Sequence, residues 1–274
     1  MEAVAGTPAP PLRSIVGRYR GYRMDGPSGV HRGIPSGQLV LVISLDDPLD
    51  IVGMPDAAQA PGKFQASVGG LHAAPVLIRH EGFQYGIFVP LTPLGAHALL
   101  GMPAGEVANR IVHLEDIFGP GAAGLADQLA SAPGWRERFA ILDRVLIDRL
   151  KEGAGPPPEV ARAWSQLLAA HGAVEVGVLA DDVGYSRRHL DELFRRELGL
   201  APKVAARVLR FERSRRLIES GQHTSLADVA AAAGYYDQAH MAREWREIAG
   251  CPPTTWIAEE LPSVQDPPAE LDAD

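Results

Sequence analysis

The chain carries one pattern twice, as LADDVGYSRRHLDELFRRELGLAP at residues 179–202 and as VAAAAGYYDQAHMAREWREIAGCPPTTW at residues 229–256. In the first half of the pattern, Leu179-Ala180-x-x-x-Gly184-Tyr185 matches Val229-Ala230-x-x-x-Gly234-Tyr235 at an offset of 50 residues. One residue is then inserted, and the offset becomes 51 for the pairs Leu190 and Met241, Phe194 and Trp245, Gly199 and Gly250, and Pro202 and Pro253. The repeat predicts two copies of one structural unit.

Each copy has the sequence features of a helix-turn-helix unit. A small residue, Ala180 or Ala230, lets two helices approach closely, and the glycine that follows permits a sharp turn. The second helix of each copy combines an apolar back with a polar front, as the spacing of Leu190, Phe194 and Leu198 shows. A plain helical bundle built by duplication would give the same pattern, so the repeat alone leaves that alternative open.

Glycine and proline delimit the helices around the repeat. We expect helices over residues 160–171 and 179–183, the second ending at Gly184, and then a helix capped by Ser186. A connecting helix should cover residues 203–219, with Pro202 in its first turn and Gly221 after its end. Everything after residue 158 therefore favours an all-helical region.

The second copy carries the more specific motif, GYYDQAHMAREWREIAGCPPTTW from Gly234. It resembles the signature of the AraC/XylS family of bacterial transcription regulators: an aromatic residue, Asp or Ser, Gln, a hydrophobic position, Arg, an aromatic, then Gly-x-x-Pro. The matching region is about residues 175–256, and the first copy matches more loosely. The resemblance implies a DNA-binding domain of two helix-turn-helix units joined by a long helix, and a β-rich sensory or dimerising domain over residues 13–150.

Only side chains opposite the apolar stripes can reach a DNA groove. Arg suits guanine O6 and N7, Gln suits adenine, and Ala suits the thymine methyl group, whereas an acid can accept from cytosine but is repelled by phosphates. The family often has a basic or neutral residue where Glu192 stands, which leaves base recognition by the first unit open. We expect phosphate contacts from Arg195, Arg196, Lys203 and Arg207. The candidate DNA-binding residues are Arg187, Arg188, Asp191, Glu192, Arg195, Arg196, Lys203, Gln238, Ala239, Ala242, Arg243 and Arg246.

The region before residue 153 shows a different pattern. Short apolar runs between residues 13 and 89, such as those at 39–43, 76–78 and 85–89, are separated by Gly, Pro and Asp, which is typical of strands in a sandwich or barrel. Between residues 94 and 152 the apolar spacing becomes helical, with Leu125, Leu129, Phe139 and Leu146 among the recurring positions. The expected fold class is α+β with two domains, the N-terminal one β-rich with helices and the C-terminal one all-α.

The sequence predicts the domain limits from composition. Three prolines and two glycines at residues 153–158 exclude both a helix and a central strand there. We therefore divide the chain into a domain at 1–152, a linker at 153–158, a DNA-binding domain at 159–260 and an acidic, disordered tail at 261–274.

Charge and composition limit the function classes. The chain has 274 residues, 46% of them hydrophobic and 22% charged, with a net charge of −8, which is ordinary for a globular protein and excludes a fibrous one. Half of the charge deficit lies in the last fourteen residues, with four acids and no base. Residues 203–216 carry a net positive charge instead, because they contain six basic side chains and a single acid, Glu212. No signal peptide or spanning helix is apparent, so we expect a cytoplasmic protein with no membrane partner.

Catalytic and metal sites find little support in the sequence. The single cysteine, Cys251, excludes a disulfide framework and a multi-cysteine metal cluster, and suits a packing role. His31, His72, His80, His97 and His113 contain no His-x-His pair, which metal-binding barrels usually require. Ser44 and Ser67 form no nucleophile–base arrangement, so we expect no enzyme activity and no cofactor.

These observations together predict a sequence-specific, DNA-binding transcription regulator. Its two units should enter two successive major grooves of double-stranded DNA, and the N-terminal domain should tune this activity through a small-molecule effector or dimerisation. RNA polymerase and a second copy of the chain are further candidate partners. The alternative is a β-barrel enzyme or small-molecule-binding protein whose helical region serves oligomerisation. The sequence identifies neither the effector, nor the operator, nor the direction of regulation.

Overall fold

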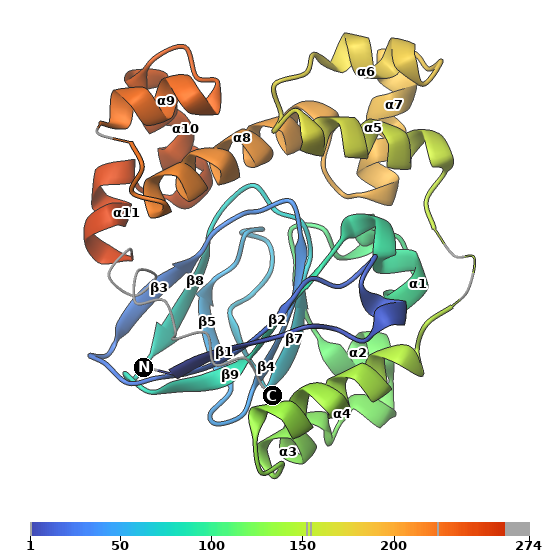
Figure 1. Cartoon of the computed structure of the whole chain (residues 1–274), viewed down its shortest axis with the longest axis vertical. Coiled ribbons are helices and arrows are strands. Elements are labelled where there is room, and N and C mark those ends of the chain that lie inside the picture. The colour runs from blue at the N-terminus through green and yellow to red at the C-terminus, as the bar shows by residue number, and fades with distance from the viewer. Residues whose placement is uncertain (1, 152, 154, 224, 261–274) are drawn as a thin grey trace.

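Alternating buried and exposed side chains build two antiparallel sheets from the N-terminal part of the chain (Figure 1). The computed structural model describes residues 2–151, 153, 155–223 and 225–260. Within them, one sheet has six strands in the order β1-β2-β9-β4-β7-β10 and the other has four in the order β3-β8-β5-β6. The strands are β1 (Glu2–Gly6), β2 (Tyr19–Met24), β3 (Gly29–Gly33), β4 (Leu39–Ser44), β5 (Leu49–Gly53), β6 (Gly62–Phe64), β7 (Ala66–Gly69), β8 (Val76–His80), β9 (Gln84–Leu91) and β10 (Ile111–His113).

The central strands of the larger sheet supply the core of this region. Leu39, Leu41 and Ile43 of β4 alternate with less buried neighbours and are fully buried. β4 pairs with β9 from Leu39 opposite Leu91 to Ser44 opposite Gly86, which sets Leu41 beside Val89. The expectation of a β-rich N-terminal region is confirmed.

Two strands lie outside the range expected from the sequence. β1 begins at Glu2, before residue 13, because Val4 and Gly6 face the interior while the strand pairs along β2. Gly6 faces the ring of Phe139 so closely that a side chain there would collide with it. β10 lies inside the region expected to be helical, and its three residues pair with β7 from Ile111 opposite Gly69. Three residues are too few to show a period in the sequence.

Helices make up the rest of the described chain. They are α1 (Ala96–Leu100), α2 (Leu114–Phe118), α3 (Leu125–Ala130), α4 (Trp135–Ile147), α5 (Pro158–Ala169), α6 (Val176–Asp182), α7 (Arg187–Glu197), α8 (Pro202–Glu219), α9 (Leu226–Ala233), α10 (Gln238–Ala249) and α11 (Pro253–Glu259). Short 3-10 turns add to them, among which η3 (Ala104–Val107) is used below. No helix among the described residues is both long and apolar enough to cross a membrane.

The connecting helix α8 organises the C-terminal half. Figure 1 shows α8 lying across the top of the sheets, with α6 and α7 at one of its ends and α9 and α10 at the other. Pro202 occupies the first turn of α8, and Gly221 after its end has a φ of +62°. The α+β fold class is confirmed. The domain limits at 152, 158 and 260 stay a prediction, and the predicted acidic tail lies outside the described residues.

Candidate nucleic-acid interface

The first helix-turn-helix unit consists of α6 and α7. Gly184 in the turn has a φ of +72°, a backbone conformation that favours glycine. The Ser186 side chain then caps α7, because its oxygen accepts a hydrogen bond from the backbone N–H of His189 at 3.2 Å. Leu190 and Phe194 are fully buried beneath α7. The turn and the apolar stripe together fix which face of α7 points outward.

The outward face of α7 carries opposite charges in contact. Arg188 Nε donates to Glu192 at 2.9 Å, and Arg195 Nε donates to Asp191 at 2.8 Å. Each pair spans one helical turn, where such contacts form readily. The side chains of Arg188 and Glu192 are 90% and 58% exposed, so water screens the attraction between them. The acids therefore offset the arginine charges on this face.

Two further arginines lie at the borders of the same face. Arg187 packs its guanidinium against Gly177 of α6, and a side chain at that position would displace it. Arg196 Nη2 lies 2.7 Å from a carboxylate oxygen of Glu197, which is buried. Both arginines stay exposed enough for a phosphate to approach.

The second unit repeats this construction with α9 and α10. Gly234 in the turn has a φ of +86°, and the Asp237 side chain caps α10 by accepting from the backbone N–H of His240 at 2.6 Å. Met241 and Trp245 are fully buried beneath the helix. The indole N–H of Trp245 donates to Ser214 Oγ of α8 at 2.9 Å, which ties α10 to the connecting helix.

α10 separates its charges between two faces. On the side toward α8, buried Glu244 accepts from Arg207 at 3.0 Å and from Arg210 at 2.8 Å. On the outward side, Gln238 and Arg243 are exposed, and their side chains make no hydrogen bond or ion pair with any residue that the structure describes. No acid of α10 is therefore paired with a cation on its outward face.

Several arginines of α8 form ion pairs with glutamates of α8 and α10. Arg207 is held by Glu244 and also by Glu247, while Arg215 pairs with Glu219 and Arg216 pairs with Glu212 at 2.5 Å. This placement argues against the phosphate contact expected of Arg207, because helix packing already engages its charge. Lys203, at the first turn of α8, is exposed and without an ion pair to a described residue.

Most of the predicted DNA-binding residues have exposed side chains. Ten of the twelve are exposed, and Asp191 and Ala242 are half-buried. The pairing on α7 has a signal that was available in the sequence, because Arg188 and Glu192, like Asp191 and Arg195, are four residues apart. The pairing of the α8 arginines with α10 lacked such a signal, since Arg207 and Glu244 are 37 residues apart.

Comparison with known proteins also identifies a helix-turn-helix domain in this part of the chain. A family model described as a helix-turn-helix domain matches residues 179–259, which contain both units and the helix between them. The chain therefore carries an AraC-type helix-turn-helix domain in these residues. It is a transcription regulator with a C-terminal DNA-binding region. No curated protein matches the chain by sequence.

Solved structures of ToxT from Vibrio cholerae share the fold of this chain. ToxT of strain O395 is 8% identical with a TM-score of 0.52, and the match covers 90% of this chain and 98% of that one. Its complex with (E)-4-(8-methylnaphthalen-1-yl)but-3-enoic acid, also 8% identical, gives 0.53 over 89% and 98%. Unsaturated fatty acid bound ToxT of strain SCE256, 9% identical, gives 0.52 over 89% and 95%. At these identities the likeness concerns the fold alone.

The N-terminal region of the chain contacts the first unit directly. His97 of α1 places Nε2 at 2.9 Å from the buried carboxylate of Glu197, the last residue of α7. Burial opposes the charge of Glu197, but hydrogen bonds from His97 and Arg196 outweigh it and hold the pKa of this carboxyl below its usual value. Gly105 of η3 lies so close to the carbonyl oxygens of Arg195 and Arg196 that a side chain there would collide with them.

The N-terminal region also contacts the rest of the DNA-binding region. The backbone N–H of Gly37 donates to the buried carboxylate of Glu212 in α8 at 3.0 Å. Arg32 of β3 binds Glu259 at 2.6 Å and Glu260 at 3.1 Å, at the end of α11. These contacts reach both ends of the DNA-binding region and the helix between them.

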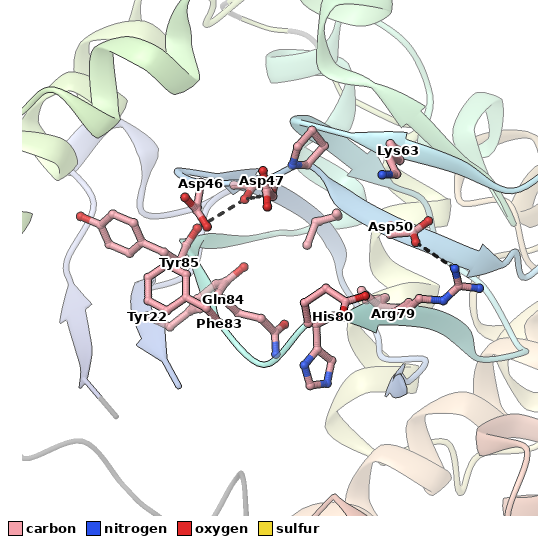
Figure 2. Close-up of a pocket in the computed structure, with 15 residues that line it drawn as sticks. Tyr22, Asp46, Asp47, Asp50, Lys63, Arg79, His80, Phe83, Gln84 and Tyr85 are labelled. Atoms are coloured by element: carbon pink, nitrogen blue, oxygen red, sulfur yellow. Dashed lines mark hydrogen bonds and ion pairs between the residues drawn. The ribbon is translucent and has the colours of Figure 1, made fainter. Parts of the chain in front are cut away.

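A cavity of about 260 Å³ opens at one end of the two sheets (Figure 2). Its lining mixes aromatic side chains such as Tyr22 and Phe83 with the carboxylates of the β4–β5 loop, including Asp46. Arg79 and Asp50 form an ion pair of 3.4 Å along its wall, drawn as a dashed line in Figure 2. Among the described residues, no three His, Cys, Asp or Glu side chains gather closely enough to hold a metal ion.

Proposed function

We propose that this regulator binds double-stranded DNA sequence-specifically, with α7 and α10 entering two successive major grooves. The observation that carries this is the placement of two matched units at the two ends of one helix. α8 has 18 residues, which corresponds to a length of about 27 Å. Successive major grooves on one face of DNA are about 34 Å apart, a spacing that helices mounted at or beyond the two ends of α8 can match.

The exposed side chains of α10 suit base recognition. Arg243 can donate twice to guanine, Gln238 can form a bidentate pair with adenine, and Ala239 and Ala242 fit thymine methyl groups. Arg246 extends the same face. On α7 the corresponding roles fall to Arg187, Arg188 and Arg195, whose charges compete with Asp191 and Glu192.

Phosphate contacts would fix the register of both units on the duplex. Arg196 at the end of α7 and Lys203 at the start of α8 are exposed cations close to the first unit. Such contacts add affinity for any sequence and make binding depend on salt.

Selection from a randomised duplex pool tests the proposed function. The full chain should enrich particular sequences, and its affinity should fall with salt, with a log–log slope near −5 if about six phosphates are neutralised. Failure to enrich any duplex, or an affinity that does not change with salt, would contradict the proposal.

We also infer that the N-terminal region tunes DNA binding rather than catalysing a reaction. The contacts from His97 to Glu197, from Gly37 to Glu212 and from Arg32 to Glu260 connect this region to α7, to α8 and to the end of α11. A small molecule that favours one arrangement of these contacts would change DNA affinity by a coupling of about 1–3 kcal/mol. ToxT has been solved with a fatty acid and with a naphthalenyl butenoic acid, which supports a small-molecule effector here.

The double variant His97→Ala, Arg32→Ala tests this coupling in the full chain. We expect it to bind the selected duplex at least about fivefold more tightly than the unchanged chain, with the same base preference, because the units can then adjust to the two grooves. Arg162→Ala is the control, since its ion pair with Asp182 at 2.7 Å lies within the helical region. Equal affinities for the double variant and the unchanged chain would mean that these contacts do not regulate binding.

Several sequence-based expectations stay predictions. They are the cytoplasmic location, a contact with RNA polymerase, dimerisation through the N-terminal region and the independent folding of residues 159–260. The absence of enzyme activity is also a prediction, which turnover of a metabolite by the full chain would contradict.

A further inference from the structure

The turns of the two units differ by one residue. In the first unit Tyr185 is followed directly by Ser186, the residue that caps α7. In the second unit Tyr236 stands between Tyr235 and the capping residue, Asp237. The inserted residue of the repeat is therefore Tyr236, and it immediately precedes the cap of the second recognition helix.

The two tyrosines of the second turn have opposite surroundings. Tyr235 is 5% exposed, with the Arg210 guanidinium 5.0 Å from its ring centroid and the His240 ring edge-on at 5.3 Å. Tyr236 is 93% exposed and has no hydrogen bond or ring contact with any described residue. Val178, the next most exposed of the large apolar side chains described, is 57% exposed. Packing within the chain thus explains Tyr235 and leaves Tyr236 without a role.

From its position, Tyr236 would contact the DNA backbone rather than the bases. Residues in the first turns of a recognition helix contact base edges, so the residue before the cap lies where the groove meets the sugar–phosphate chain. A tyrosine hydroxyl donates readily to phosphate oxygens, and its ring can cover the adjacent sugar. The negative charge of Asp237 is partly offset by the positive end of α10, because its carboxylate caps that helix and accepts from the backbone N–H of His240.

We propose that Tyr236 is a DNA-backbone contact of the second unit, donating its hydroxyl to a phosphate at the edge of the groove that α10 enters. This inference rests on the proposed DNA binding. It gives the second unit an anchor that the first unit lacks, since no residue occupies the equivalent place between Tyr185 and Ser186. A backbone contact adds affinity without changing which sequence is preferred.

Two variants of the full chain, Tyr236→Phe and Tyr236→Ala, test the proposal on the selected duplex. Loss of the hydroxyl in Tyr236→Phe should weaken binding about threefold, and loss of the ring as well in Tyr236→Ala should weaken it about tenfold. Val178→Ala, which removes an exposed apolar side chain from α6 of the first unit, should leave the affinity unchanged. Both tyrosine variants should keep the base preference of the unchanged chain.

Phosphate ethylation interference supplies the second measurement. The unchanged chain should show a phosphate, at the edge of one protected groove, whose ethylation weakens binding, and Tyr236→Phe should lose that single effect. Unchanged affinity of Tyr236→Ala, or a loss of preference at one base pair, would overturn the proposal. If the unchanged chain selects no duplex at all, the proposed function falls and this inference falls with it.

Discussion

The two helix-turn-helix units share a framework and differ in how they use their charges. Both have a left-handed glycine in the turn, a capped second helix and a fully buried aromatic side chain, Phe194 or Trp245, beneath it. On α7 the acids pair with arginines of the outward face. On α10 the buried acid Glu244 pairs with α8 instead, and Arg243 stays without an ion pair to any described residue. The two units therefore share a buried aromatic side chain, a turn glycine and a helix cap, whereas their outward faces differ.

The cores of the two units differ as well. The buried residues of the first unit, such as Leu179 and Phe194, belong to a cluster that continues into the N-terminal sheets and includes Leu41. Those of the second unit, such as Trp245, form a separate cluster with residues of α8 and α11, and Ile34 of the N-terminal region packs against it. We infer that the first unit is the one on which the N-terminal region acts, and that the second is the principal site of base recognition.

The largest effect should come from breaking the helix that joins the units. Val208 is 1% exposed in the middle of α8, and proline there removes a hydrogen bond and bends the helix at a cost of about 3 kcal/mol or more. Val208→Pro should lower the affinity for the selected duplex by about 100-fold or more, as a binding titration would show.

The control for this variant is Val208→Ala, which keeps the helix and loses only packing. A cooperative thermal transition must be present in both variants, so that loss of binding reports geometry and not unfolding. Tight binding by a folded Val208→Pro chain would show that the units do not depend on a rigid connection.

A matched pair of substitutions compares the two outward faces. Arg243→Ala should cost about 1–3 kcal/mol of binding free energy and relax the preference at one base pair, because a free guanidinium is lost. Arg188→Ala should cost less than about 1 kcal/mol, because Glu192 already engages that side chain. Selection from the randomised pool with each variant measures both effects. Equal losses for the two variants would mean that the pairing on α7 does not weaken its contact with DNA.

The smallest effect should come from removing an acid of the first unit. Glu192→Gln releases Arg188 and removes a charge that phosphates repel, so affinity should rise about two- to threefold at low salt. Its control is Glu175→Gln, which removes one acid at the residue that precedes α6. A fall in affinity confined to duplexes with a cytosine at one position would instead identify Glu192 as a base-contacting residue.

Local features of the fold were predictable from the sequence, and long-range ones were not. Gly184, Ser186, Pro202 and Gly234 act within a few residues of themselves, so their turns and caps follow from the sequence alone. The contact between His97 and Glu197 joins residues 100 positions apart, and no local pattern indicates it. The same holds for the ion pairs that Arg207 and Arg210 of α8 form with Glu244 of α10.

The spacing of the two recognition helices on DNA is the most direct test of the account. A hydroxyl-radical footprint of the full chain on its selected duplex should show two protected segments on one face, separated by about 10 base pairs. With Arg243→Ala, protection should weaken at one segment and persist at the other. A single protected segment, or equal weakening of both, would contradict the account that two unlike units bind two successive grooves.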